Sequence, residues 1–118
     1  MKSSQYKDIM AELRDEYLQS FDEKLQSLDQ LHQNKKWSEL ELEFHKLKGT
    51  GATYGLPEVS QLCEKLEQLC KISSEVPRAW VDGAIDCLNK IREKYQGSSQ
   101  WQLDQDPFYQ EICKGDPS

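Results

Sequence analysis

One histidine occupies an unusual position near the middle of the 118-residue chain. His45 is one of only two histidines, and lysines and glycines follow it closely: Lys46, Lys48, Gly49, Gly51 and Gly55. A glycine inside a helix costs about 0.5–1 kcal/mol relative to alanine. Several glycines in one helical stretch therefore predict that something approaches its backbone closely. We interpret this as a phosphoryl-transfer partner, and His45 as the group that the partner reaches.

The imidazole of His45 is suited to phosphoryl transfer if it is exposed. An exposed imidazole is largely neutral at about pH 7 and keeps a lone pair on one ring nitrogen, so it can attack an activated phosphoryl group. Lys48 follows one turn later, where its ammonium can neutralise charge on phosphate oxygens. The alternative is that His45 is an ordinary residue on a solvated face. The second histidine, His32, lies at a polar helix end and is assigned no role.

A helical wheel of residues 38–54, at about 100° per residue, separates a packed face from an open face. The packed face carries Leu40, Phe44, Leu47 and Gly51. His45 points roughly away from these residues. The residues that share its open face are Glu41, Leu42, Lys48, Gly49 and Ala52. Gly49 and Ala52 therefore keep the surface beside the ring low, whereas Gly51 lets two helices approach each other.

The chain as a whole is patterned as amphipathic helices. Apolar residues recur at steps of three and four near the N-terminus: Tyr6, Ile9, Met10, Leu13, Tyr17, Leu18, Phe21, Leu25, Leu28 and Leu31. This pattern fits one long helix, or a short helix followed by a long one. Similar faces run over residues 38–54, 59–70 and 81–95, with polar or proline-containing connections between them.

Local signals mark the ends of the helix that carries His45. Ser38 and Glu41 have the spacing of a capping box, which predicts that the helix starts there. Gly55 is suited to end it in a left-handed conformation. Pro57 pre-sets the first turn of the next helix.

These elements predict an all-α fold, an antiparallel four-helix bundle with an additional N-terminal helical segment. The length suits one domain, and we assign residues 1–96 to the bundle. Residues 97–118 form a C-terminal extension, in which Asp106 and Pro107 predict a short helix packed on the bundle. The alternative is that the aromatic segment 100–118 docks on a partner.

Charge and composition bear on the partners and on the compartment. The net charge of −6 disfavours nucleic acid and anionic membranes, because both require a basic surface. No apolar run approaches the ~18 residues of a membrane span, and the polar N-terminus has no signal region, so we expect a cytoplasmic protein. The cysteines form no C-x-x-C pair and are expected to be buried, reduced thiols: Cys63, Cys70, Cys87 and Cys113. The alternative for them is a metal or thiol-redox role.

Two segments resemble the signature of histidine-containing phosphotransfer (HPt) domains. The segment His45-Lys46-Leu47-Lys48-Gly49-Thr50-Gly51-Ala52 matches the form H-x-L-K-G-[ST]-[SAG]-A, and Gly55 stands at the end of the helix. The segment Leu62-Cys63-Glu64-Lys65-Leu66-Glu67 matches L-C-x-x-L-E in the next helix. The resemblance is close over residues 45–67, and the helix pattern agrees over residues 6–95. The tail beyond Gln96 is not part of the common family pattern.

The resemblance implies roles for particular residues. His45 would accept a phosphoryl group from the aspartate of a receiver domain or from a sensor histidine kinase, and pass it to a response regulator. Lys48 would steady the phosphate, and Gly49 would admit the partner. Glu67 would accept a hydrogen bond from Nδ1 of the imidazole and leave Nε2 to attack. The alternative for Glu67 is an ordinary solvated charge.

The chain is predicted to be a phosphate carrier and not an enzyme. It has no G-x-x-x-x-G-K loop and nothing that resembles an ATP-binding or kinase domain. We expect no cofactor of its own, because the receiver's acidic residues would hold the Mg²⁺. The docking surface is predicted around His45, on part of the first long helix and on Glu41, Leu42, Lys46 and Ala52. We expect a monomer.

The sequence leaves two further functions open. One is a helical interaction module that is not phosphorylated. The other is the phosphotransfer segment of a larger chemotaxis-type kinase.

Overall fold

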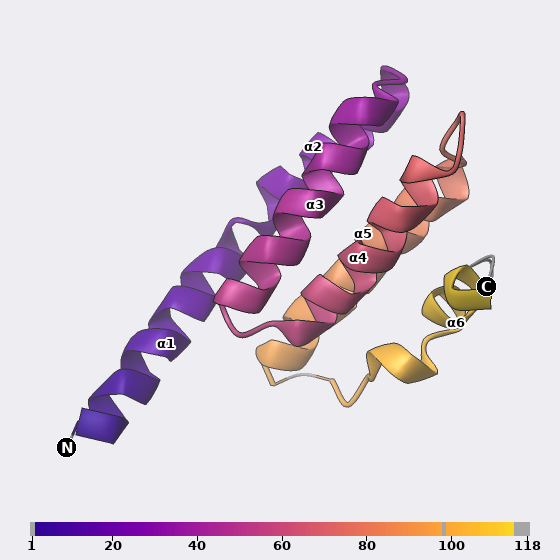
Figure 1. Cartoon of the computed structure of the whole chain (residues 1–118). Helices are drawn as coiled ribbons and strands as arrows, with labels where there is room; N and C mark the ends of the chain where they lie inside the picture. The colour runs from indigo at the N-terminus through magenta and orange to yellow at the C-terminus, as the bar shows by residue number, and fades with distance from the viewer. Residues whose placement is uncertain (1, 98, 115–118) are drawn as a thin grey trace.

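Four helices pack side by side in a closed ring in the computed structural model of the chain (Figure 1). They are α2 (Phe21–Gln33), α3 (Trp37–Thr53), α4 (Pro57–Lys71) and α5 (Arg78–Tyr95). Helix α2 contacts α3, α3 contacts α4, α4 contacts α5, and α5 contacts α2. Short connections make successive helices antiparallel. The predicted all-α four-helix bundle is confirmed.

The structure describes residues 2–97 and 99–114, with side chains from Lys7 onward. Two more helices and one short 3₁₀ helix complete this part: α1 (Lys2–Gln19), η1 (Leu103–Gln105) and α6 (Pro107–Lys114). The additional N-terminal helical segment and the short C-terminal helix are thus both present. Met1, Ser98 and residues 115–118, which belong to the segments predicted as 1–96 and 97–118, lie outside the described residues, and the boundary at residue 96 stays a prediction.

The core is built from the apolar stripes that the periodicity predicts. Each bundle helix contributes large side chains that are almost completely buried: Phe21, Leu28, Leu40, Phe44, Leu62, Leu66, Leu88 and Ile91. Burying one such side chain contributes about 1.5–3 kcal/mol. This packing orients the helices and leaves the opposite face of α3 open.

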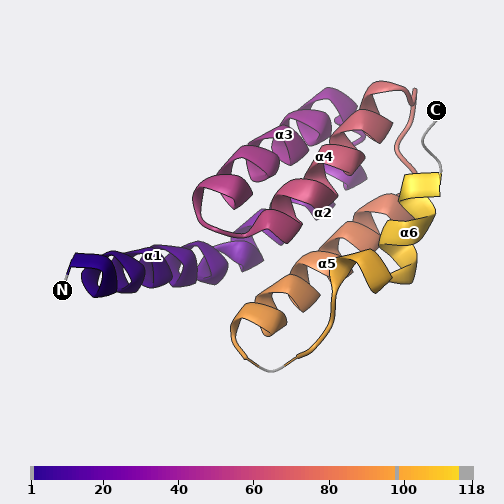
Figure 2. The same ribbon diagram turned by 60° about the horizontal axis from the view of Figure 1, so that its bottom comes forward.

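The N-terminal stripe forms two helices, which settles the choice between one long helix and two. The break lies at Ser20, whose hydroxyl donates a 2.6 Å hydrogen bond to the carbonyl of Tyr17. Such bonds from a serine to its own helix bend the backbone. Helix α2 therefore joins the bundle, while the N-terminal half of α1 extends past it (Figure 2).

The predicted capping box at Ser38 and Glu41 is wrong. Helix α3 already begins at Trp37, with Lys36 as its N-cap and no side-chain cap. The cause is the tight turn that precedes it, in which Lys35 has a φ of 55° and the N–H of Lys36 donates to the carbonyl of Leu31. This turn starts α3 before Ser38 can act as its cap.

The end of α3 agrees with its prediction. Gly55 has a φ of 76°. Its N–H donates to Ala52, and the N–H of Leu56 donates to Gly51 at 2.8 Å. These two bonds form a Schellman motif, which satisfies carbonyls at the helix end. Pro57 then opens α4 in its first turn, so α4 returns antiparallel to α3.

Gly51 sets the close approach of α3 and α4. A Cβ atom at this position would lie 2.8 Å from Cβ and Cγ1 of Val59 on α4. Such a distance is below ordinary contact, so only glycine fits without displacement of the helices. The predicted packing role of Gly51 is confirmed, and it brings the two helices of the candidate site together.

The C-terminal extension is fastened to the bundle through Asp106. Its buried carboxylate accepts hydrogen bonds from the indole of Trp101 at 2.9 Å and from the N–H of Phe108 at 2.9 Å, and so caps α6. Phe108 packs against Gly83 of α5, and Ile112 is buried. The aromatic segment thus docks on the bundle over its described residues.

Candidate functional site

His45 lies near the middle of α3, with its imidazole turned toward α4. Its side chain is 59% exposed, whereas that of Glu67 on α4 is 6% exposed. Nδ1 of His45 lies 2.9 Å from Oε2 of Glu67. An exposed ring is therefore held from one side by a buried carboxylate of the neighbouring helix.

Glu67 is the centre of a small ionic cluster. Nζ of Lys48 lies 3.0 Å from its Oε1, and Nζ of Lys71 lies 3.5 Å from its Oε2. Although burial alone would raise the pKa of Glu67, the hydrogen bonds from Lys48 and His45 and the two ammonium charges hold it below its ordinary value. Glu67 is consequently an anion near pH 7 and a permanent acceptor.

An ionised carboxylate can only accept hydrogen bonds, which decides how the imidazole is protonated. We assign the proton of the neutral ring to Nδ1, which donates it to Glu67. Nε2 then keeps its lone pair. The arrangement orients the ring of His45, with Lys48 as a cation one turn away on the same helix, and a nitrogen that keeps its lone pair has the chemistry of a nucleophile.

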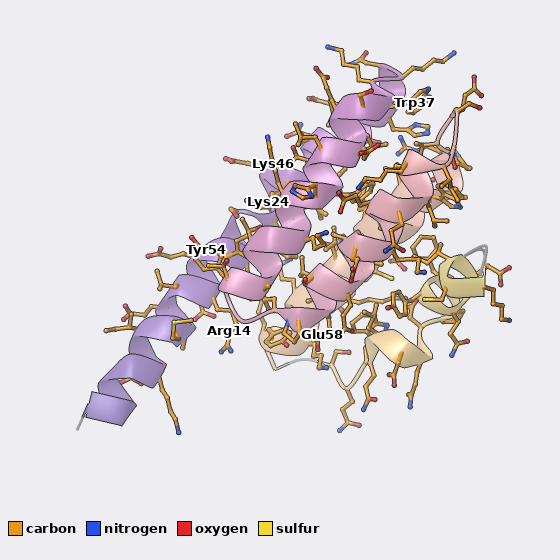
Figure 3. The ribbon with its side chains drawn as sticks, viewed as in Figure 1. Arg14, Lys24, Trp37, Lys46, Tyr54 and Glu58 are labelled. Atoms are coloured by element: carbon orange, nitrogen blue, oxygen red, sulfur yellow. The ribbon has the colours of Figure 1, made fainter. Side chains whose placement is uncertain are left out.

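The surface beside the imidazole is low. Gly49 is exposed, and a Cβ atom built there would have no neighbour within 4 Å. Leu42 is 50% exposed, and Lys46 and Ala52 are also exposed. These predicted docking residues share the open side of α3. Figure 3 labels one of them, Lys46.

Glu41 is half-buried, unlike Leu42, Lys46, Gly49 and Ala52. It lies near Cys70 of α4, where its charge adds to the effect of burial in raising the pKa of that thiol to about 12. Glu41 therefore stands at the edge of the open face, between α3 and α4.

The end of α1 lies beside the second half of α3. The hydroxyls of Tyr17 and Thr50 are 2.6 Å apart, and the ring of Tyr17 stacks on that of Tyr54. Nζ of Lys24 on α2 lies 5.0 Å from the centre of the Tyr17 ring. Figure 3 labels Lys24 and Tyr54. Part of the N-terminal helical region thus borders the face that carries His45.

Sequence reasoning missed Lys71. The available signal was its spacing, because it follows Glu67 by four residues on the same helix and such residues face each other. His32, which was assigned no role, binds the carbonyl of Val76 through Nε2 at 2.7 Å. That contact lies at the far end of α3 from Gly55, and it is a structural bond.

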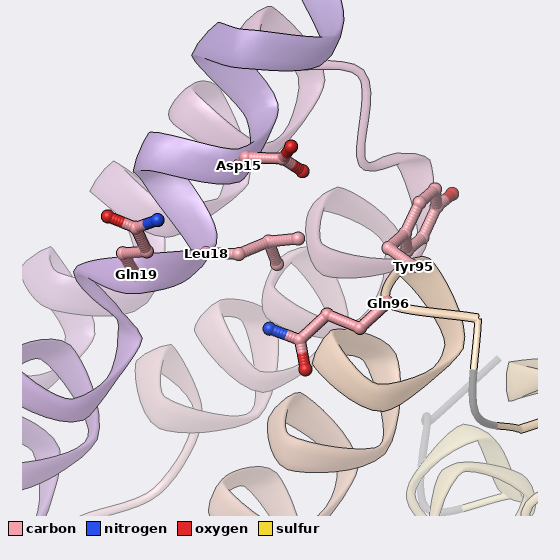
Figure 4. A pocket seen from close by; sticks show the side chains of 5 residues that line it. All are labelled: Asp15, Leu18, Gln19, Tyr95 and Gln96. Carbon is pink, nitrogen blue, oxygen red and sulfur yellow. The ribbon is translucent and has the colours of Figure 1, made fainter.

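Several surface pockets lie among the described residues, and His45 does not line any of these. One of about 360 Å³ lies between α1 and the end of α5, lined by Asp15, Leu18, Gln19, Tyr95 and Gln96 (Figure 4). The candidate site is instead an open surface, which suits a reaction with a group presented by another protein.

The described residues also include possible metal ligands and thiols. No three His, Cys, Asp or Glu side chains among them gather where they could hold a metal ion. All four cysteines are free, and three of them are buried while Cys113 is half-buried. In the same part of the chain, no helix is long and apolar enough to cross a membrane.

Comparison with known proteins assigns the family. The chain matches the family model of the Hpt domain over residues 12–101, which is most of its length and includes His45, Lys48 and Glu67. No curated protein and no solved structure matched the chain. The family match agrees with the helical bundle and with the exposed histidine at the middle of α3. The chain belongs to the Hpt domain family.

Proposed function

We propose that His45 is the phosphoryl carrier of this domain, accepting the group from a receiver aspartate or a sensor kinase and passing it to a response regulator. Hpt domains are phosphocarrier modules of phosphorelays and not catalytic kinase domains. The observation that carries the proposal for His45 is its 2.9 Å contact with the buried Glu67, which leaves Nε2 free on an exposed ring.

The transfer can be written at the level of bonds. The lone pair of Nε2 attacks the phosphorus of an aspartyl phosphate, so that an N–P bond forms and the acyl P–O bond breaks. The aspartate leaves as a carboxylate with the bonding electrons. The Nδ1 proton stays hydrogen-bonded to Glu67, whose charge stabilises the positive ring that forms. Lys48 neutralises phosphate oxygens during the transfer.

The partner would dock on the open face of α3 and on the adjoining N-terminal helical region. Leu42 offers an apolar contact, Lys46 a charge, and Gly49 and Ala52 an unobstructed approach. Glu41 would contribute at the edge. We place the Mg²⁺ that receivers use on the receiver, with no cofactor on this chain. A monomer in the cytoplasm fits this role.

The test is transfer from a phosphorylated receiver domain in the presence of Mg²⁺. Phosphate should move to this chain, be acid-labile, and be lost in His45→Gln. The matched control is His32→Gln, which should retain transfer because the contacts of that histidine, with the carbonyl of Val76 and the ring of Trp37, lie away from His45. Transfer that survives His45→Gln would refute the assignment. Receiver binding that ignores His45→Ala, without phosphorylation, would favour a simple interaction module.

A further inference from the structure

The two lysines at Glu67 approach different oxygens of its carboxylate. Lys48 lies 3.0 Å from Oε1. Lys71 lies 3.5 Å from Oε2, which also accepts the hydrogen bond from His45. Lys48 belongs to α3, as His45 does, whereas Lys71 belongs to α4, as Glu67 does. Each oxygen of the buried carboxylate therefore has its own cation, and only one cation shares the helix of the nucleophile.

Phosphorylation changes what Lys48 must neutralise. A phosphoryl group brings about −1.5 to −2 charge near pH 7. Lys48 lies one turn from His45 and is the cation best placed to meet that charge. Its departure would leave Oε1 of Glu67 without an ion-pair partner, although this side chain is only 6% exposed. An uncompensated buried charge is strongly unfavourable, so a carboxylate without a second cation would retain Lys48.

We propose that Lys71 is a positioning residue, which neutralises Glu67 while Lys48 moves from that carboxylate to the phosphoryl group on His45. Lys71 is suited to this because it lies one turn after Glu67 on α4 and keeps its contact when α3 side chains rearrange. It forms no covalent bond and transfers no proton. This inference rests on the proposed function of His45.

Chemical phosphorylation by phosphoramidate tests the inference without a protein partner. In this reaction Nε2 forms the N–P bond while the P–N bond of the reagent breaks and its amine leaves as ammonia. Lys71→Gln should slow phosphorylation of the full chain by about threefold to fivefold, the size expected for a partly exposed ion pair. Lys71→Arg should restore the rate, because it returns the charge.

Lys36→Gln is the matched control. Lys36 is 55% exposed and pairs with Glu39 at 3.8 Å, much as Lys71 is 56% exposed and pairs with Glu67 at 3.5 Å. The difference lies in the carboxylate. Glu39 is 59% exposed, so water solvates its charge and it does not need a lysine to neutralise it. Lys36→Gln should therefore leave the rate unchanged.

Testing Lys71→Gln in the Lys48→Gln variant as well as in the wild type separates a positioning role of Lys71 from simple structural support. In Lys48→Gln no ammonium has to leave Glu67, so adding Lys71→Gln should cause no further loss of rate. A wild-type rate in Lys71→Gln, or an equal loss in both backgrounds, would overturn the inference. Failure of transfer from a receiver would contradict the proposed function alone, since the phosphoramidate rates would still decide the role of Lys71.

Discussion

Nδ1 of His45 lies 2.9 Å from Oε2 of Glu67, across the interface between α3 and α4. The carboxylate is almost fully buried and the imidazole is more than half exposed. The protein thus holds one nitrogen of the ring while the side chain as a whole stays 59% exposed.

Glu67→Gln tests the orientation of the imidazole. A glutamine amide can accept a hydrogen bond through its oxygen or donate one through its nitrogen, and it has no charge for the two lysines. We expect phosphorylation of His45 to slow by about 10–100-fold, as for other groups that orient an imidazole through its second nitrogen. The ring should lose its uniform Nδ1–H form, which ¹⁵N chemical shifts report. An unchanged rate with an unchanged tautomer would show that Glu67 is only a structural charge.

Gly49→Ala and Gly51→Ala form a matched pair two residues apart on α3. The open position of Gly49 predicts that alanine raises the free energy of unfolding by about 0.5–1 kcal/mol through helix propensity. The contact of Gly51 with Val59 predicts that alanine lowers it by about 1–3 kcal/mol. Urea denaturation measures both. Gly49→Ala should also slow phosphoryl transfer from a receiver but not from phosphoramidate. If the wild type and Gly49→Ala accept phosphate from the receiver at the same rate, the partner does not approach at this position.

Stability should fall in acid because several carboxyls have lowered pKa values in the folded state. Although burial alone would raise the pKa of Glu58, hydrogen bonds from Lys94 and Tyr95 hold it below its ordinary value. Its contribution is fully present above the unfolded pKa of about 4.3 and is lost as pH falls through the lower folded value. The free energy of unfolding, measured in urea between about pH 6 and pH 3, should therefore decrease. Glu58→Gln should flatten this slope, and an identical slope would contradict the assignment.

Asp106→Ala should release the C-terminal extension. The substitution removes the cap of α6 and leaves the indole of Trp101 without its acceptor, so we expect a loss of about 2 kcal/mol. Amide exchange in α6 should accelerate, while phosphorylation of His45 should be unchanged because α6 does not contribute to the site. The exposed Asp104→Ala serves as the control and should change stability by less than ~0.5 kcal/mol. Protection of α6 that persists in Asp106→Ala would show that its apolar contacts suffice.

The cysteines should differ in reactivity. Burial raises the pKa of both Cys70 and Cys87 to about 12, and it also raises the pKa of Cys63. Because the thiolate is the reactive form, a thiol reagent should label the half-buried Cys113 first in the folded protein and all four cysteines after unfolding. Cys113→Ser should remove the fast phase of labelling of the folded protein. Rapid labelling of a second cysteine in the folded variant would indicate local opening of the core.

Local patterns predicted the helical elements well because burial imposes a period on each of them. The stripe of Leu40, Phe44 and Leu47 is buried, and His45 is exposed, as a 3.6-residue repeat requires. Gly55 and Pro57 also act as predicted, since left-handed φ and a first-turn proline are properties of single residues.

Predictions failed, or stayed open, where a second segment decides the outcome. The predicted capping box at Ser38 does not form, because the turn at Lys35 starts α3 earlier. Residues around Ser20 carry a helical pattern on both sides, and only the packed structure shows the break. The sequence of the aromatic tail is compatible with docking on the bundle or on a partner, and the contacts of Asp106 in the folded chain decide for the bundle.

The sequence by itself determined that this protein is a helical bundle with an outward histidine among small residues, because periodicity and residue type are properties of one helix at a time. The HPt resemblance adds the prediction that Glu67 bonds the imidazole. Only the tertiary structure decided that this carboxylate is buried, that it meets His45 across 22 positions of sequence, and that Lys71 joins it. Those relations depend on how far α3 and α4 are rotated and shifted against each other, and the side chains of both helices set that packing together.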